Sequence, residues 1–387
     1  MSKIRAFDTD VTDNSRILSK ISDYINQLPV TSQFKHIISD AKFSQSNPGY
    51  YVNYPYLFSN RQEDERIDFL CIAGYLYYQS IIYLDQALDK KGPISQLFPI
   101  INICEEESVR LLSSIFGLNS PFWTLWQQRK VEYFTAYQID MTTHSVASFE
   151  DFENLADKKS TFGKLAIDAL YILSELSEET YIKCLLLHKL FYSAFQILDD
   201  ILDIREDNVS GQFNIATSLL KQEIANGNIK KEALDSADNM VKYVHICGIS
   251  DTLYAKAEEY IQKAEALAKE LNLPYMLSEI AIMHNTIINH RLTVSGYLKT
   301  IKAKAYLSEQ FMPHASVSTA VHAGLKYLQQ QQHGGAWEEI CNNAGVSNIW
   351  ATGFITSFLN EITYVNGVKG MVAQAVTYLK NNENENA

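Results

Sequence analysis

Apolar residues recur along this chain at the spacing of an amphipathic helix. In the segment 13–28 they are Ile17, Ile21, Tyr24, Ile25 and Leu28, which fall at i, i+4, i+7, i+8 and i+11 and so share one helix face. Alternation with period two, which would indicate strands, is not sustained anywhere in the sequence. The pattern predicts an all-α protein, with helices near 13–28, 63–90, 96–116, 121–143, 150–175, 178–207, 213–225, 230–246, 252–271 and 274–299.

The composition changes near Phe311-Met312-Pro313. Beyond this point the sequence is rich in Ala, Gly, Gln and Asn, and it contains the run Gln329-Gln330-Gln331-Gln332. A shift of this kind, beside a proline, is typical of a domain boundary. We therefore expect a helical domain over 1–305 and a small helical module over 312–387.

The formal net charge of −12 argues against a nucleic-acid partner, because such binding depends on Lys and Arg to neutralise phosphates. No run of about 18 uncharged apolar residues predicts an integral membrane segment, and the N-terminus resembles neither a signal nor a transit peptide. We expect a soluble, cytoplasmic protein. Its five scattered cysteines are most simply explained as buried free thiols.

The strongest chemical signal is the stretch 195–203, which reads FQILDDILD and follows the apolar segment 184–191. Asp199 and Asp203 are four residues apart and share a helix face with Gln196 and Asp207. Carboxylates this close repel each other, and in so apolar a segment they need cations or a solvated cleft to remain ionised. The alternative is an ordinary solvated helix face.

A second pair of carboxylates, Asp85 and Asp89, ends another long apolar helix with the same spacing. Two such pairs facing each other across a cavity would form an oxygen-only site suited to Mg²⁺, which takes further ligands from phosphates. The chemistry implied is the loss of diphosphate. By itself the pair Asp85 and Asp89 is equally consistent with a surface i, i+4 pair.

The stretch 195–203 resembles the second aspartate-rich motif of the trans-isoprenyl diphosphate synthases, FQxxDDxxD, and Asp85-Gln86-Ala87-Leu88-Asp89 resembles the first. The likeness covers roughly 60–300 and identifies the chain as similar to the class I isoprenoid synthase superfamily, an all-α helical bundle. Its members act on prenyl diphosphates with Mg²⁺.

The resemblance also assigns expected roles to residues. Asp85, Asp89, Asp199 and Asp203 would hold Mg²⁺, and Asp200 would complete the catalytic carboxylates. Lys159-Ser160 resembles the family's Lys-Thr, so Lys159 would bind the diphosphate beside Gln196. Lys158 and Lys164 are alternatives for that lysine.

Three departures concern the family's second substrate, isopentenyl diphosphate. The Arg-Arg-Gly that usually follows the first motif is replaced by Lys90-Lys91-Gly92, no N-terminal Gly-Lys-x-x-Arg is visible, and the later Gly-Lys-Asp is absent. We therefore expect a terpene synthase that ionises one prenyl diphosphate, with a chain-elongating prenyltransferase as the alternative. Gln86 in the first motif also leaves a non-catalytic regulatory subunit open.

Aromatic side chains on these helices could shelter and stabilise a carbocation. The small residue Ser80, five positions before Asp85, indicates a deep pocket for a C20 or longer substrate, whereas Tyr77 could close the same channel. Core packing is the simpler explanation for any single aromatic residue. The residues concerned are Tyr75, Tyr77, Tyr78, Tyr83, Phe134, Tyr137 and Phe191.

The C-terminal module resembles a Gln-Trp repeat of the squalene–hopene cyclase and protein-prenyltransferase toroids. The likeness rests on the segment 324–337, which ends at Trp337, and on the segment 350–354, with a spacing one residue short if Gln331 is the repeat's glutamine. About three repeats are needed for independent stability. We expect this single copy to pack on the synthase domain or on a second chain, and a homodimer is one such assembly.

Overall fold

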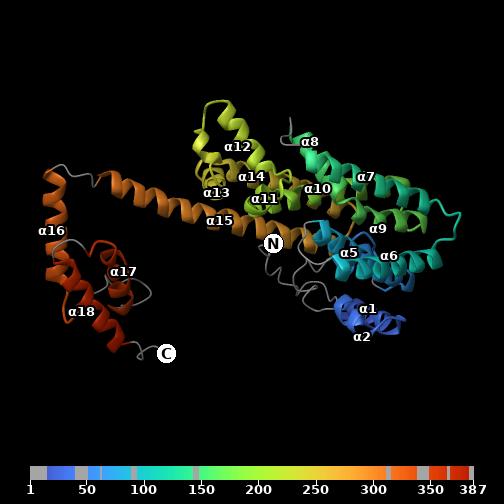
Figure 1. Cartoon of the computed structure of the whole chain (residues 1–387), viewed down its shortest axis with the longest axis horizontal. Coiled ribbons are helices and arrows are strands. Elements are labelled where there is room, and N and C mark those ends of the chain that lie inside the picture. The colour runs from blue at the N-terminus through green and yellow to red at the C-terminus, as the bar shows by residue number, and fades with distance from the viewer. Residues whose placement is uncertain are drawn as a thin grey trace. The chain divides into compact units, whose positions relative to one another are not determined.

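The computed structural model describes residues 15–39, 51–61, 63–88, 94–142, 148–310, 315–337, 348–363 and 367–382. Within these ranges the chain is helical and contains no strand, only an isolated bridge between His333 and Ala336. The all-α prediction is confirmed (Figure 1). The helices are α1 (Ser15–Gln27), α2 (Ser32–Ile38), α4 (Tyr54–Leu57), α5 (Glu65–Leu88), α6 (Ile94–Ile115), α7 (Phe122–Thr142), α8 (Phe149–Lys159), α9 (Thr161–Ile172), α10 (Glu178–Leu202), α11 (Ile204–Ser210), α12 (Ile215–Ala225), α13 (Ala237–Ile246), α14 (Ile249–Glu270), α15 (Pro274–Gln310), α16 (Ala315–Gln331), α17 (Asn348–Asn360) and α18 (Val368–Asn381), with a 3₁₀ turn η2 (Lys231–Leu234).

Two compact units make up the chain, Met1–Leu298 and Lys299–Ala387. The division between them falls inside α15. The domain boundary that the change in composition predicts, between 305 and 312, stays a prediction.

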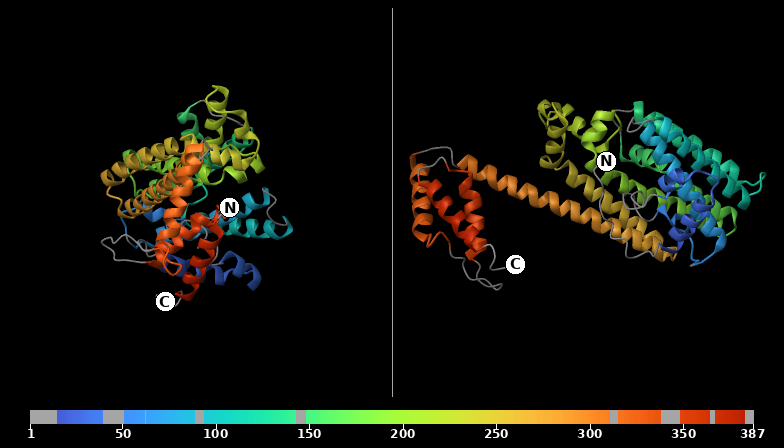
Figure 2. Two further views of the ribbon diagram at one scale, coloured as in Figure 1. Left: turned by 90° about the vertical axis from the view of Figure 1, so that its left-hand side faces the viewer. Right: turned by 60° about the horizontal axis from the view of Figure 1, so that its bottom comes forward.

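Helix α10 lies at the centre of the first unit. It begins at the N-cap Ser177, whose hydroxyl accepts a hydrogen bond from the backbone N–H of Thr180 and so satisfies one of the free amides of the first turn. It packs against α8, α9, α12 and α14, and Figure 2 shows the helices of the first unit from two further sides. Because neighbours surround the helix, apolar residues lie on several of its faces, and Asp200 near its end is buried in the bundle.

Helices α5 and α6 pack together, as do α7 and α9, and α5 also contacts α9. Within the described part of the chain, the stretch Glu65–Leu84 of α5 is the one segment long and apolar enough to cross a membrane. Of this stretch 61% is buried inside the protein, and a core helix has the same length and composition.

Three helix boundaries differ from the expectation. The single helix predicted over 150–175 is interrupted at Ser160, which caps both α8 and α9, and the helix predicted over 178–207 is interrupted at Asp203. Neither position carries the Gly or Pro that usually announces a break. The last long helix continues to Gln310, beyond the predicted end at 299.

The second unit has a small core of its own, formed by Trp337, Leu359, Val368, Met371, Val372 and Ala375. The side chain of Gln332 donates to the carbonyls of Gly335 and Met371, at 3.2 and 2.9 Å. Gly335 has a φ of +91°, and a Cβ at this position would lie 2.6 Å from the carbonyl oxygen of Gln374. The turn between α16 and Trp337 therefore requires glycine.

Gln332 is thus the glutamine whose hydrogen bonds stabilise this turn. The spacing to Trp337 in the resemblance to a toroid repeat was counted from Gln331 instead. Trp337 is buried, and its indole N–H donates to the carbonyl of Leu328 at 2.7 Å. These contacts explain both residues by packing, and the resemblance of the module to a toroid repeat stays a prediction.

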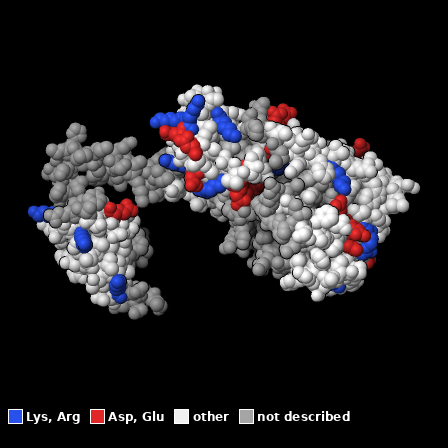
Figure 3. Space-filling model, viewed as in Figure 1, with Lys and Arg blue, Asp and Glu red and all other residues white. Residues whose placement is uncertain are grey.

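The cysteines follow the expectation with one exception. Cys71, Cys104 and Cys184 are free and buried, whereas Cys247 is free and exposed, so for this residue the expectation of burial is wrong. Cys341 lies outside the described residues. On the face shown in Figure 3, Lys and Arg are interspersed with Asp and Glu over the first unit.

Candidate active site

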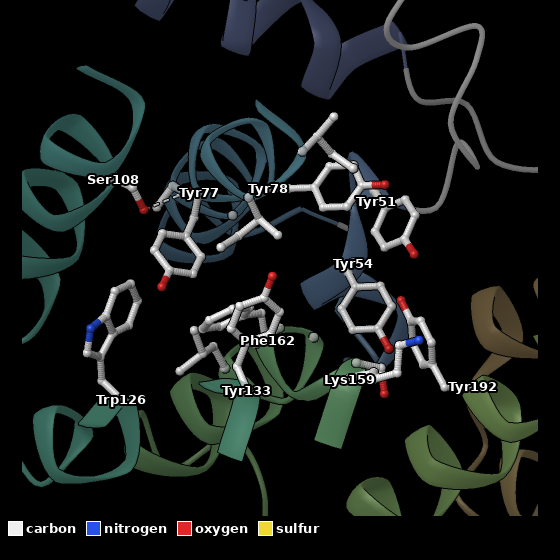
Figure 4. Close-up of a pocket in the computed structure, with 18 of the residues that line it drawn as sticks. Tyr51, Tyr54, Tyr77, Tyr78, Ser108, Trp126, Tyr133, Lys159, Phe162 and Tyr192 are labelled. Carbon is white, nitrogen blue, oxygen red and sulfur yellow. Dashed lines mark hydrogen bonds between the residues drawn. The ribbon is translucent and has the colours of Figure 1, made fainter. Parts of the chain in front are cut away.

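A cavity of about 370 Å³ lies in the first unit, between α4, α5, α6, α7, α9, α10 and the end of α8. Figure 4 shows Tyr54, Lys159 and Tyr192 together at one side of it, with Trp126 and Tyr77 at the opposite side. Most of the other lining side chains are aromatic or aliphatic. The cavity thus has a polar end and an aromatic interior, which suits a ligand with a charged head and an apolar tail.

Lys159 is the one lysine or arginine among the described residues that line this cavity, and Asp140 is the one carboxylate. The Lys159 ammonium lies 3.2 Å from an Asp140 carboxylate oxygen. Burial disfavours the charged ammonium, but Asp140, Asp200 and Asp199 outweigh it and raise the pKa of Lys159. The lysine is therefore cationic at neutral pH and held at the polar end.

The two alternative lysines are placed differently. Lys164 is buried in α9, where its ammonium lies 2.6 Å from Asp157 and 3.7 Å from Glu132. Lys158, in the last turn of α8, is half-buried, and it is absent from the cavity lining. Of the three lysines considered, the geometry brings Lys159 to the cavity.

Asp199 and Asp203 stand at the C-terminal end of α10, and their side chains are half-buried outside the cavity lining. Burial and the neighbouring Asp203 raise the pKa of Asp199 to about 7. Burial likewise raises the pKa of Asp207, one turn further on, to about 6. A helix C-terminus also repels negative charge, so these carboxylates form a site that a cation would stabilise.

Asp200 and Gln196 make a different set of contacts. The two Asp200 carboxylate oxygens accept hydrogen bonds at 2.7 Å, one from the Gln196 amide and one from the backbone N–H of Ile215. Asp200 is thus engaged in holding α12 against α10. Gln196 lines the cavity, and its predicted place beside a diphosphate stays a prediction.

The first aspartate pair is described only in part. Asp85 lies in the last turns of α5, where the backbone but not the side chain is described, and Asp89 lies outside the described residues. In the part of the chain that is described, no three His, Cys, Asp or Glu side chains are grouped as a metal site. The crowded carboxylates of α10 nevertheless fit Mg²⁺, which prefers oxygen ligands and completes its shell with water and phosphate.

The aromatic residues singled out in the sequence lie in three different environments: the cavity lining, the core and the surface. Tyr77, Tyr78 and Tyr137 line the cavity, whereas Phe134 is 55% exposed. Phe191 is buried in the core, and Tyr75 is buried with its hydroxyl donating to the carbonyl of Ile38. For Phe191 and Tyr75 core packing, the simpler explanation, therefore holds, and none of these last three residues lines the cavity.

One residue of the site, Asp140, is missing from the sequence-based prediction. Asp140 lies on α7, seven residues after Tyr133, and shares a helix face with Ala136 and Tyr137, which also line the cavity. This spacing from the aromatic residues is the sequence signal that could have placed Asp140 in the site. Ser80 is buried and donates to the carbonyl of Tyr77 at 2.7 Å. Tyr77, rather than Ser80, faces the cavity.

These helices form an all-α bundle around the cavity. No family model matches the sequence, and no curated protein matches it either. In structure, the chain is similar to the heptaprenyl diphosphate synthase of Staphylococcus aureus, with a TM-score of 0.56 and 15% identity over 71% of this chain and 98% of that one.

Two further solved structures are similar. The geranylgeranyl pyrophosphate synthetase of the archaeon Geoglobus acetivorans has a TM-score of 0.55 and 16% identity, and covers 70% of this chain and 97% of its own. The octaprenyl pyrophosphate synthase of Helicobacter pylori has a TM-score of 0.51 and 16% identity, and covers 70% of this chain and 99% of its own. At these identities the likeness establishes the fold.

Proposed function

We propose that this chain is a Mg²⁺-dependent prenyltransferase of the prenyl diphosphate synthase type, which condenses an allylic prenyl diphosphate with isopentenyl diphosphate. The observation that carries the proposal is the position of Lys159 and Gln196 in the lining of an aromatic cavity, with the charge of Lys159 stabilised by Asp200 and Asp199 of α10. The similar solved structures are chain-elongating synthases, which favours this alternative over the terpene synthase that the sequence departures suggest.

The charges at the polar end suit the departure of diphosphate. Lys159 would bind the leaving group, and Asp199 and Asp203, together with Asp85 and Asp89 of the first motif, would hold Mg²⁺. Bound Mg²⁺ would neutralise the negative charge that develops on the diphosphate oxygens. The Gln196 amide gives one hydrogen to Asp200, and its second hydrogen would be available to a diphosphate oxygen.

The aromatic interior suits the carbocation and the prenyl tail. Tyr77 packs against Trp126 and Phe162, with ring centroids 4.7 and 5.0 Å apart, and these rings close the cavity opposite Lys159. Aromatic faces stabilise a cation and exclude water from it. The length of the product chain would then depend on Tyr77.

A terpene synthase remains the second candidate because of one observation. The cavity lining offers a single cation within the described residues, Lys159, whereas two diphosphate substrates need two sets of positive charges. The segment 89–93, which would supply part of a second set, lies outside the described residues.

One experiment separates these functions. The purified chain is incubated with geranyl, farnesyl or geranylgeranyl diphosphate and Mg²⁺, with and without isopentenyl diphosphate, and the products are separated by chromatography. A longer diphosphate that forms only with isopentenyl diphosphate supports the prenyltransferase. A hydrocarbon or alcohol from one substrate supports the terpene synthase.

A regulatory subunit would give neither product. It would also lack a Mg²⁺-dependent increase in melting temperature in the presence of diphosphate, because it would not retain the metal site.

A further inference from the structure

Helices α8 and α9 are separated by a bend at Ser160, the residue directly after Lys159. Ser160 has φ −90° and ψ 7°, a conformation that does not need glycine, and neither of its neighbours is Gly or Pro. The periodicity of the sequence predicts one continuous helix over 150–175. Because the local sequence does not require the bend, contacts with other elements must maintain it.

One ion pair spans this bend. The ammonium of Lys164, on α9, lies 2.6 Å from a carboxylate oxygen of Asp157, on α8. Lys164 is buried, and its second partner is Glu132 of α7, at 3.7 Å. One buried cation thus joins α7, α8 and α9, and neither Lys164 nor Asp157 belongs to the cavity lining.

Other contacts secure the bend and the start of α9. The Thr161 hydroxyl donates to Glu132 at 2.6 Å, and the Ser160 hydroxyl lies 3.1 Å from Nε2 of His188, on α10. The other ring nitrogen of His188 lies 2.7 Å from the Tyr54 hydroxyl, on α4. These contacts hold the residues from 160 onward, whereas the ion pair across the bend holds the last turn of α8.

Asp157 and Lys159 lie on nearly opposite sides of this last turn. They are two residues apart, which on an α-helix corresponds to about 200° around the axis. Lys159 accordingly lines the cavity, whereas Asp157 pairs with Lys164. An attachment on one side of a helical turn restricts its rotation, and so restricts the direction of a side chain on the other side.

The pair of Lys159 with Asp140, at 3.2 Å, cannot hold this turn alone once a ligand is bound. A diphosphate bound to Lys159 competes with the Asp140 carboxylate for the same ammonium. Asp157 does not take part in that competition, because its partner is Lys164. The ion pair of Asp157 with Lys164 is therefore the attachment that stays intact when Lys159 binds the ligand.

We propose that Asp157 and Lys164 are positioning residues for the diphosphate. Their ion pair fixes the last turn of α8, and this turn keeps the Lys159 ammonium at the polar end of the cavity. The inference rests on the proposed function, which assigns the diphosphate to Lys159. Neither Asp157 nor Lys164 touches the ligand, so both act through Lys159.

The test measures the dissociation constant of inorganic diphosphate with Mg²⁺ by isothermal titration calorimetry on the full chain. Asp157→Ala removes the ion pair from the α8 side, while Lys164 keeps Glu132. We expect the dissociation constant to rise about three- to tenfold, less than for Lys159→Ala. Lys164→Met is a poorer choice, because the loss of a cation weakens anion binding whether or not position matters.

The sign of the effect separates positioning from charge. Asp157 is negative, so its removal strengthens anion binding if the residue acts only through its electric field. Positioning predicts the opposite, weaker binding. Glu153→Ala is the matched control, because it also removes one carboxylate from α8, one turn earlier, together with the hydrogen bond from the Tyr260 hydroxyl at 2.6 Å. It should not raise the dissociation constant.

A double-mutant cycle with Lys159→Ala tests whether Asp157 acts through Lys159. In the Lys159→Ala background the additional change Asp157→Ala should leave the dissociation constant unchanged. Urea denaturation of the same variants measures their free energy of unfolding. The loss of stability caused by Asp157→Ala should be present in both backgrounds, because Lys164 loses its partner in each.

A second measurement needs no ligand. The side chain of Lys159 is 29% exposed beside Asp140, so its acetylation by a trace of acetic anhydride can be followed by peptide mass spectrometry. Asp157→Ala should raise the rate of acetylation at Lys159 by about threefold or more, because the ammonium leaves Asp140 more often. Glu153→Ala should leave this rate unchanged.

The two proposals fail in different ways. A parent chain that binds no diphosphate in the presence of Mg²⁺ contradicts the proposed function, and the acetylation rates then decide by themselves whether the ion pair positions Lys159. An unchanged or lower dissociation constant for Asp157→Ala overturns the positioning role, and so does an unchanged acetylation rate. A rise that persists in the Lys159→Ala background, or that Glu153→Ala shares, also overturns it and leaves the ion pair a structural contact.

Discussion

The Lys159 ammonium lies 3.2 Å from the Asp140 carboxylate, which joins the end of α8 to the end of α7 at the polar end of the cavity. A diphosphate must therefore compete with Asp140 for this lysine, or share it. The pair also means that removing Lys159 affects both binding and stability, because Asp140 is buried.

We predict that Lys159→Ala lowers kcat/KM by roughly ten- to more than a hundredfold, because a charge-assisted contact with the diphosphate of about 1.5–3 kcal/mol is lost. Steady-state kinetics with the allylic substrate measures the change. Lys158→Ala is the matched control and should change kcat/KM little. Equal losses in both variants would remove Lys159 from the site.

The stability effect of the same variant can be separated from its kinetics. Lys159→Ala leaves the Asp140 carboxylate without its cation, which lowers the free energy of unfolding. Asp140→Asn in the same chain should restore much of the stability but none of the activity. Lys164→Ala is unsuitable as a surface control because Lys164 is buried and paired with Asp157.

We predict that Asp199→Asn abolishes turnover and stabilises the metal-free protein. Burial and Asp203 raise the pKa of Asp199 to about 7, so the folded state loses stability as the pH rises from about 4 to 7, where the unfolded carboxyl is already ionised. Removing the charge removes that loss. Thermal melts at pH 8 should show a higher melting temperature without Mg²⁺ and a smaller increase when Mg²⁺ and diphosphate are added.

We predict that Gly163→Ala destabilises the first unit by about 1–3 kcal/mol, the usual effect of an extra methyl group in a packed interior. Its Cβ would lie 2.6 Å from His188. Gly296→Ala, inside α15, meets nothing within 4 Å and should stabilise its helix by up to about 1 kcal/mol. Chemical denaturation measures both, and a neutral Gly163→Ala would show that the ring can move.

We predict that Tyr77→Ala lengthens the products. Removing this ring opens the cavity toward Trp126 and Phe162, so the growing chain can extend further before it is released. Ser80→Ala is the control, because Ser80 donates to the carbonyl of Tyr77 and does not face the cavity. The measurement is the distribution of product chain lengths from one allylic substrate, separated by chromatography. An unchanged distribution for Tyr77→Ala would mean that another residue closes the end of the cavity.

We predict an acid-sensitive contact between α1 and α5. Burial disfavours the charged form of Asp68, but its hydrogen bonds with Arg16, Lys20 and Tyr56, at 2.5–2.8 Å, outweigh this and lower its pKa to about 2. The ionised carboxyl thus stabilises the fold by about 2 kcal/mol above pH 4, and this is lost as the pH falls toward 2.

Asp68→Asn tests this contact. The difference in free energy of unfolding between parent and variant, from urea titrations, should be largest at pH 5 and should shrink toward pH 2.5. A difference that does not vary with pH would mean that the charge of Asp68 is unimportant for stability.

Helix periodicity was enough to predict the all-α class, and the motif 195–203 was enough to predict the fold family. Both depend on residues close together in the sequence. The break at Ser160 was missed because no Gly or Pro announces it. Lys159, before the break, lines the cavity, whereas Lys164, after it on α9, is buried beside Asp157.

The contacts that shape the site could not be predicted, because they join residues that are far apart in the sequence. Tyr54 and His188 are 134 residues apart, and Asp140 meets Lys159 only through the packing of α7 on α8. No spacing rule connects such residues. The metal-binding roles of Asp85, Asp89, Asp199 and Asp203 stay predictions, because they depend on the two motifs facing each other across the cavity.

The close approach of Gly335 to Gln374 bears on how the second unit can change over generations. Any side chain at position 335 would meet the backbone carbonyl at 2.6 Å, and shifting that carbonyl would disturb α18, which supplies much of the small core around Trp337. Substitution of Gly335 is thus disfavoured by folding alone, whatever the function of the second unit. The exposed Phe354 and Phe358 are under no such packing constraint, so only binding to a partner would conserve them. Among natural variants of this chain, an invariant Gly335 would reflect a requirement of folding. Invariance at the exposed positions 354 and 358 would instead indicate a functional interaction.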